Sequence, residues 1–284
     1  MWKWGNRILG QRSAEPVSAP ASPVPLPPDP GFGAETEEPR HPHYDKLCAG
    51  AAAFAAHLAE LKQRQDVDFA WYPYDTMANF LHIAPLITPE CDLLFQGGKN
   101  YADIGAADGD VAFYLASLGN TCDIYDNGPT NYNGLAGARH MQGVLHLPVE
   151  VFEFDLDSPF RIDRRYDLIF FLGILYHLKN PIYVLEQLAQ ASSYLLLSTR
   201  IARCLSTDGG DLSHTSAAYL LAPRETNDDP GNYWVFTEAG LRRLAEVAGW
   251  DVVQFRTVGD VVQSNPWDAD HDERAFALLR SRKR

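Results

Sequence analysis

The sequence has few cysteines and no long apolar run. Its four cysteines, Cys48, Cys91, Cys122 and Cys204, lie far apart and form no CxxC pair. This spacing fits reduced thiols in a cytoplasm better than a disulfide framework or a zinc site. No segment approaches the roughly 20 apolar residues that a bilayer span requires, and the first ten residues are too short and too polar for a signal peptide. We therefore expect a cytoplasmic protein without a membrane partner.

Basic residues are also scarce. The chain carries 24 Lys and Arg against 37 Asp and Glu, a net charge of −13. Proteins that grip nucleic acid usually show a basic surface, so a small-molecule partner is favoured over a nucleic acid. The histidines follow no metal-ligand spacing, and the sequence predicts no metal site; they include His41, His43, His82, His140, His146, His214 and His271.

The chain divides by composition into three parts. Residues 1–43 include a stretch rich in Pro, Ala, Ser and Glu, which predicts a disordered leader. Residues 44–100 show helical spacing and predict a helical cap. Residues 101–284 alternate strand-like and helical runs and predict the main domain, with an insertion at about 205–236.

The alternation over 101–284 indicates an α/β fold. The apolar runs are YADI (101–104), TCDIY (121–125), VFEFD (151–155), DLIFFLG (167–173) and SYLLLS (193–198). Helical patterns separate most of them: one ends at Gly119, and another begins with Asn180 and Pro181. Two final runs without a helix between them predict an antiparallel hairpin. We expect a Rossmann-like, seven-stranded, mostly parallel sheet with an antiparallel C-terminal strand.

The first strand runs into a turn of small residues, DIGAADGD (103–110). Gly105, Ala107 and Gly109 leave the backbone open, which suggests that a ligand lies close against it. A dinucleotide site needs GxGxxG, whereas here the third and sixth positions are Ala107 and Asp110. Phosphate would be repelled by Asp108 and Asp110, so a cationic ligand fits better. S-adenosylmethionine (SAM) has a sulfonium, an ammonium and no phosphate.

The following strand ends carry further polar groups. Asp126, followed by Asn127, closes the second strand, where a carboxylate can accept both ribose hydroxyls. Asp155 closes the predicted third strand and is followed by Leu156, near the expected adenine. A single Asp at a strand end is more commonly a turn or cap residue, but three in register favour a binding site.

These motifs resemble class I SAM-dependent methyltransferases over about residues 98–284. DIGAADG resembles the first motif of that family, and FFLGILYHLKNPIYVLEQLA resembles the wobble-uridine tRNA methyltransferase-like branch. The resemblance implies that Asp103, Gly105 and Gly109 surround the methionine part, Asp126 the ribose and Asp155 the adenine. Cofactor contacts are also assigned to Ala107, Asn127, Leu156, Leu172 and Gly173.

One stretch departs from the relatives that use a carboxylated SAM. They place a lysine in a WKWD-like segment, whereas the matching stretch here is Trp71-Tyr72-Pro73-Tyr74-Asp75, which has no basic residue. A carboxylate would be poorly held without that cation, so plain SAM is predicted.

Tyr176 and His177, just after the fourth strand, are the catalytic candidates. His177 is either a general base or a structural histidine bonded to a loop. Tyr176 either orients substrate or packs. Substrate contacts are expected from an amide- and aromatic-rich stretch, with an ordinary surface loop as the alternative; the candidates are Asn227, Asp228, Asn232, Tyr233 and Trp234, together with Tyr74.

The sequence thus predicts a SAM-dependent methyltransferase that acts on O or N of a small molecule, a sugar or natural-product intermediate. A tRNA wobble-uridine methyltransferase and a non-catalytic SAM-binding partner subunit remain alternatives. A nicotinamide dehydrogenase is disfavoured by Asp110. The acceptor and the oligomeric state are not determined by the sequence.

Overall fold

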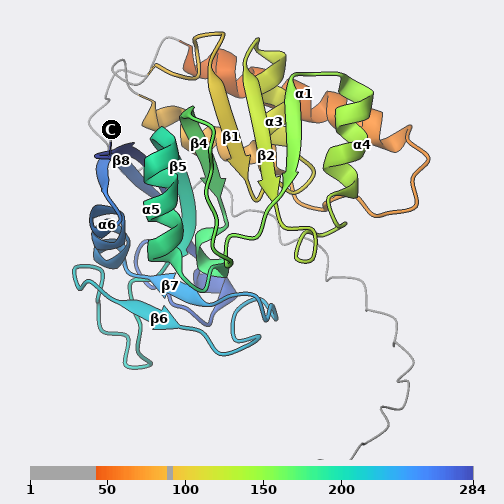
Figure 1. Ribbon diagram of the computed structural model, residues 1–284. Helices are drawn as coiled ribbons and strands as arrows, with labels where there is room; N and C mark the ends of the chain where they lie inside the picture. The colour runs from red at the N-terminus through yellow and green to blue at the C-terminus, as the bar shows by residue number, and fades with distance from the viewer. Residues whose placement is uncertain (1–42, 88–91, 284) are drawn as a thin grey trace, which may run out of the picture.

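The computed structural model describes residues 43–87 and 92–283. One central sheet is covered by helices on both faces (Figure 1). The predicted leader lies outside the described residues, except for its last residue. In the described part of the chain, no helix is both long enough and apolar enough to cross a membrane.

The sheet has a parallel body and an antiparallel end. Its order runs β3-β2-β1-β4-β5, all parallel, and continues with β9 antiparallel to β5 and β8 antiparallel to β9. The strands are β1 Asn100–Ile104, β2 Thr121–Asp126, β3 Val149–Glu153, β4 Tyr166–Leu172, β5 Ser192–Ile201, β8 Trp250–Gly259 and β9 Glu273–Ser281. The predicted Rossmann-like sheet with its C-terminal antiparallel strand is confirmed.

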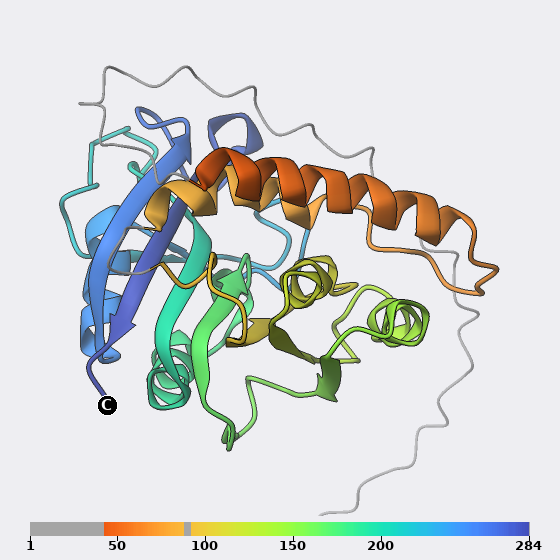
Figure 2. The same ribbon diagram turned by 90° about the horizontal axis from the view of Figure 1, so that it is seen from above.

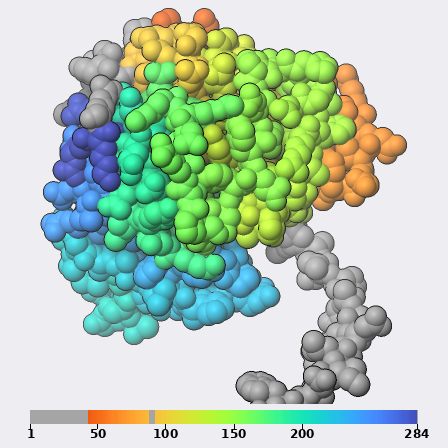
Figure 3. All heavy atoms as spheres, in the orientation of Figure 1, coloured from red at the N-terminus to blue at the C-terminus, as the bar shows by residue number. Residues whose placement is uncertain are grey.

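The long polar segment after β5 is not only a loop. It contains β6 Ala218–Leu220 and β7 Trp234–Phe236, an antiparallel pair that joins the end of β5. The described residues therefore hold nine strands in one sheet, two more than the sequence predicts. The segment lies below the carboxyl ends of the parallel strands (Figure 1), and in the space-filling view it forms the lower left part of the molecule (Figure 3).

The helices form two layers, one on each face of the sheet (Figure 2). One layer holds α1 Tyr44–Gln63, α3 Asp110–Ser117 and α4 Ala136–Leu145; the other holds α5 Pro181–Ala191 and α6 Glu238–Val247. The chain between α1 and β1 forms η1 Thr76–Asn79, α2 Phe80–Ile83 and η2 Ala84–Leu86. The symbol η marks a short 3₁₀ helix, and two further ones are η4 Leu175–His177 and η5 Ala269–His271.

Strand periodicity explains why both layers are needed. In β4, Leu168 and Phe170 join the core under α1 and α3, whereas Ile169 and Phe171 join the core under α5 and α6. All four are fully buried. A strand whose two faces are both apolar requires cover on both sides, as the continuous apolar runs of the sequence indicate.

The local signals at the helix ends are also confirmed. Asn180 caps α5 by accepting a hydrogen bond from the backbone N–H of Tyr183 at 3.2 Å, and Pro181 is the first helical residue. Gly119 follows α3 with φ +87°, a conformation that a glycine adopts without strain.

The order of the strands determines where a ligand-binding site lies on the sheet. β1 has β2 on one side and β4 on the other, and the chain crosses from one half of the sheet to the other between them. Ligands of open α/β sheets bind at the carboxyl ends of the strands beside such a reversal. The turn after β1, the end of β2 and the turn after β4 meet there.

Candidate active site

The turn after β1 is built from backbone conformations that L-residues rarely adopt. Gly105, Ala107 and Gly109 have φ of +71°, +54° and +84°. The group that lies against Gly105 is a protein side chain: a Cβ added there would lie 2.1 Å from Ile174 Cδ1. Packing with Ile174 is thus one reason for a glycine at this position, and the contact with a ligand stays a prediction.

Asp126 stands at the end of β2 and organises the neighbouring loops. Its Oδ2 accepts hydrogen bonds from the backbone N–H of Ala107 at 3.1 Å and from Asn131 Nδ2 at 2.8 Å, while its Oδ1 accepts from the backbone N–H of Asn127 at 2.8 Å. A carboxylate has about four acceptor positions, so capacity for a ligand remains. The side chain is only partly buried, and burial raises its pKa.

Asp103 lies beneath this carboxylate on β1. Its side chain is buried, at 4% exposure, and burial, followed by the charge of Asp126, raises its pKa to about 8. Among the described residues, no basic group lies within 4.0 Å of either carboxylate. Two adjacent acids without a cation favour a positively charged ligand at this place.

Asp108 and Asp110 have a different role from the one that the sequence suggests. Lys62 of α1 contacts Asp108 at 3.1 Å and Asp110 at 2.8 Å. Asp108 also accepts hydrogen bonds from the backbone N–H of Tyr72 at 2.9 Å and from Asn133 Nδ2 at 2.8 Å. Lys62 therefore compensates part of their charge within the protein, and Asp108 holds the aromatic segment 71–75 against the turn through the backbone of Tyr72.

Asp155 departs from its predicted position. β3 ends at Glu153, two residues earlier than predicted, and the Asp155 side chain is exposed. It accepts hydrogen bonds from Ser158 Oγ at 2.6 Å and from the backbone N–H of Asp157 at 2.9 Å, and the Ser158 bond lowers its pKa. The common turn use of Asp is thus present here. The neighbouring Leu156 is half-buried against the core under α5.

The turn after β4 holds the catalytic candidates. His177 Nδ1 lies 3.0 Å from the carbonyl oxygen of Gly231 and 4.0 Å from an oxygen of Asp229. A bond from Nδ1–H to the Gly231 carbonyl leaves Nε2 unprotonated in the neutral ring. Burial lowers the pKa of His177, which favours the neutral ring. The loop contact predicted for a structural histidine is present, and it coexists with a free ring nitrogen.

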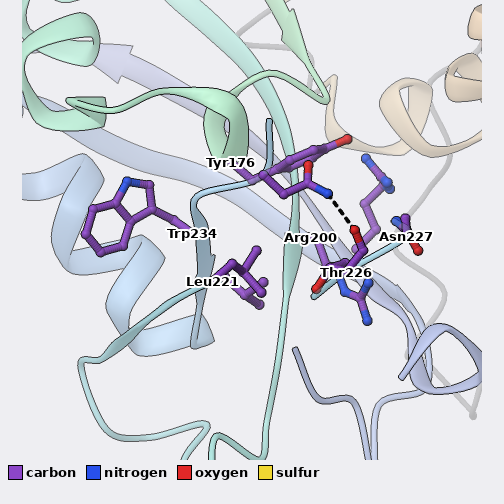
Figure 4. A pocket seen from close by; sticks show the side chains of 9 residues that line it. Tyr176, Arg200, Leu221, Thr226, Asn227 and Trp234 are labelled. Atoms are coloured by element: carbon purple, nitrogen blue, oxygen red, sulfur yellow. Dashed lines mark hydrogen bonds between the residues drawn. The ribbon is translucent and has the colours of Figure 1, made fainter. Parts of the chain in front are cut away.

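A small cavity opens beside Tyr176 (Figure 4). It is lined by Tyr176, Arg200, Leu221, Thr226, Asn227, Asn232, Trp234, Val235 and Arg274. Three of the predicted substrate residues, Asn227, Asn232 and Trp234, are therefore brought together with a catalytic candidate.

The other predicted substrate residues lie elsewhere. Asp228 is 82% exposed and pairs with Arg224 at 3.0 Å on the surface. Tyr233 contributes its backbone, because its N–H donates to the carbonyl of Tyr176 at 2.8 Å. Tyr74 is exposed and packs its ring against Tyr72, with centroids 5.4 Å apart. Neither Asp228 nor Tyr233 lines the cavity.

Sequence reasoning missed two arginines of the cavity, Arg200 on β5 and Arg274 on β9. The charged run DADHDER (268–274) has the composition of a solvated loop, but its last two residues belong to β9. Glu273 is fully buried and bonds Arg203 at 2.6 Å. The apolar run over 275–279 was the available signal, since it extends back to these residues once β9 is paired with β5.

Comparisons with known proteins agree with this geometry. Residues 77–255 match the model of a methyltransferase domain family. The N-terminal domain of EvdMO1, solved in the presence of S-adenosylhomocysteine (SAH) and D-fucose, is 17% identical, with 86% of this chain and 100% of that chain covered and a TM-score of 0.51. Coclaurine N-methyltransferase, bound to N-methylheliamine and SAH, is 13% identical, with 85% and 89% covered and a TM-score of 0.51.

At these identities the two structures show the fold alone. No curated protein sequence matches the chain, and none of the comparisons supports the resemblance to the wobble-uridine branch. The family model nevertheless spans more than half of the chain and includes the turn after β1, the end of β2 and the turn after β4. The chain therefore belongs to the methyltransferase domain family, and it is a SAM-dependent methyltransferase of class I fold.

Proposed function

We propose that this methyltransferase transfers a methyl group to an oxygen or nitrogen of a small polar molecule, a sugar or a natural-product intermediate. The observation that carries the proposal is the coincidence, at one edge of the sheet, of the uncompensated Asp103–Asp126 pair with a polar cavity beside Tyr176. The presence of D-fucose in the EvdMO1 crystals supports the sugar class. The net charge of −13 supports a small molecule over tRNA.

The cofactor fits the residues at the strand ends. SAM supplies an activated methyl group on a sulfonium when it is bound. The acids of β1 and β2 would compensate its positive charge, and Asp126 retains about one acceptor position for a ribose hydroxyl. The proposed cofactor contacts are Asp103, Gly105, Ala107, Gly109, Asp126, Asn127, Asp155, Leu156, Leu172 and Gly173.

His177 is the proposed general base. A neutral imidazole with a free Nε2 can accept a proton from an acceptor hydroxyl or amine as that group attacks. The hydrogen bond of Nδ1 to Gly231 fixes the tautomer and the orientation of the ring. Tyr176, whose ring lies 4.3 Å from that of His177, would line the path between cofactor and acceptor.

Calorimetry with the full chain tests the cofactor assignment. Asp126→Ala should weaken SAH binding by about 1–3 kcal/mol, because a charge-assisted hydrogen-bonding group is lost. Asp163→Ala is the control, because that carboxylate is 83% exposed on the surface and should leave the affinity unchanged. Equal affinities for all three proteins would remove Asp126 from the site.

Methyl transfer is then measured as SAH formation with a panel of sugars and amines, and with tRNA. Turnover with a sugar or an amine supports the proposal. Turnover with tRNA alone favours the wobble-uridine alternative. SAH binding without turnover on any acceptor favours the non-catalytic partner subunit.

A further inference from the structure

The cavity beside Tyr176 contains a half-buried positive charge, Arg274, that the methyl-transfer chemistry does not use. A Cβ added to Gly173 would lie 3.7 Å from Arg274 Nη1 and 3.6 Å from Tyr176 Oη. The Arg274 guanidinium therefore lies directly beside the turn after β4, where the methyl group is expected. Its Cζ is 5.9 Å from the centroid of the Tyr176 ring.

The two arginines of the cavity are compensated differently. Arg200 lies 3.0 Å from Asp272 and donates to the carbonyl oxygens of Asn265 at 2.9 Å and Asp268 at 2.8 Å. Among the described residues, no carboxylate oxygen lies within 4.0 Å of Arg274. Its polar neighbour in the cavity is the phenol of Tyr176, and the charge of Asp272 acts on it only from beyond 4.0 Å. Arginine is protonated at any ordinary pH, so Arg274 contributes a lasting unpaired cation.

A second polar group of the cavity also lacks a partner. Asn232 is 5% exposed, and its Nδ2 donates to the carbonyl oxygen of Thr226 at 3.1 Å, the bond drawn in Figure 4. This bond fixes the orientation of the amide, and the buried Oδ1 has no hydrogen-bond partner among the described residues. The Asn232 side chain belongs to a residue that lines the cavity. A buried acceptor without a partner costs free energy that a ligand donor would recover.

The size and position of the cavity suit one end of a larger molecule. Its volume is about 20 Å³, which admits one oxygen of an anionic group while the rest of the molecule lies outside the cavity. Tyr72 of the aromatic segment lies near enough to Tyr176 and Arg274 for their charges to affect it. Burial, followed by the charge of Tyr176, raises the pKa of Tyr72 to about 12. The Tyr72 hydroxyl therefore stays protonated near the cavity and can act as a hydrogen-bond donor.

From these contacts we propose that the methyl acceptor carries an anionic oxygen group, held by Arg274 and Tyr176, with a neighbouring hydroxyl or amine that donates to Asn232. The shared chemistry is a carboxylate or a phosphate ester on a hydroxylated carbon skeleton. Arg274 is then a specificity-determining residue that positions the acceptor. This inference rests on the proposed function, because it assigns the substrate class of the same site.

The test uses the SAH-saturated full chain and matched acceptor pairs. D-glucuronate is compared with D-glucose, D-galacturonate with D-galactose, and glucose 6-phosphate with D-glucose, by calorimetry and then by methyl transfer with SAM. At least one acid should bind tenfold or more tightly than its neutral partner. The uronates report a carboxylate and the phosphate ester reports a phosphate.

Variants of β9 locate the effect. Arg274→Met should abolish the preference for the acid and leave SAH affinity within about twofold, and Arg274→Lys should restore part of it, because the charge returns without the bidentate geometry. Arg280→Met is the matched control, an arginine of the same strand that pairs with Asp251 at 3.6 Å, and it should keep the full preference.

Three results overturn the inference. They are equal binding of every acid and its neutral partner, an unchanged preference in Arg274→Met, and a loss of SAH affinity in Arg274→Met that matches the loss for the acid. The last result would assign the arginine to the cofactor. Failure of the wild-type protein to bind SAH at all would instead contradict the proposed function.

Discussion

Replacing Asp103 by Asn tests the electrostatic basis of the site. The folded protein raises the pKa of this carboxyl from 3.8 to about 8. Between these values the folded state holds a proton that the unfolded state has released. The free energy of unfolding therefore falls as pH rises, by up to about 1.4 kcal/mol per pH unit, and the loss is complete above about pH 8.

The asparagine variant cannot ionise, so it lacks this contribution. Its stability relative to the wild type should increase with pH, by on the order of 3 kcal/mol between pH 5 and pH 7.5. Urea denaturation followed by tryptophan fluorescence at several pH values measures the difference. Asp163→Asn, at an exposed position, is the control and should run parallel to the wild type.

Proton release on SAM binding provides a second test of the raised pKa of Asp103. SAM binding should make the wild-type carboxyl release a proton below pH 8, because the positive charge favours its ionised form. Calorimetry in two buffers of different ionisation enthalpy detects this proton. Parallel stability profiles of wild type and Asp103→Asn, or binding without proton release in both, would refute the reasoning.

Three other substitutions probe the base, the turn and the helix that covers it. His177→Ala should slow methyl transfer by roughly a hundredfold or more with unchanged SAH affinity, and unchanged turnover of this variant would exclude His177 as the base. Because burial lowers the pKa of His177, the wild-type rate should fall only below about pH 6.5. Lys62→Met should cost about 3 kcal/mol in urea denaturation, since two carboxylates lose their partner; a cost near zero would show that solvent already compensates them. Gly105→Ala should destabilise through its positive φ and the Ile174 contact, and a double-mutant cycle with Ile174→Ala should recover at least about 1 kcal/mol; strict additivity would argue against the contact.

Sequence patterns were sufficient for the parts of the fold that depend on neighbours in the chain. The apolar runs at β4 and β5 mark buried strands because period-two burial on both faces leaves no polar positions. Asn180, Pro181 and Gly119 mark helix ends because their chemistry acts on the nearest backbone groups. The class of cofactor followed from Asp126 and the turn after β1, because both lie at strand ends that the local sequence pattern marks.

Patterns were insufficient where the partner of a side chain lies far along the chain. Asp108 and Asp110 look like ligand-facing acids until Lys62, 46 and 48 positions away, is placed beside them. Arg274 is the last residue of a charged run in the sequence, and only the pairing of β9 with β5 brings it to the turn after β4. Contacts between residues close in the chain are set by local backbone geometry, whereas the pairing of buried charges is set by the packing of the whole sheet. The sequence alone therefore determined the fold class and the cofactor class. Only the tertiary structure decided which side chains face the acceptor.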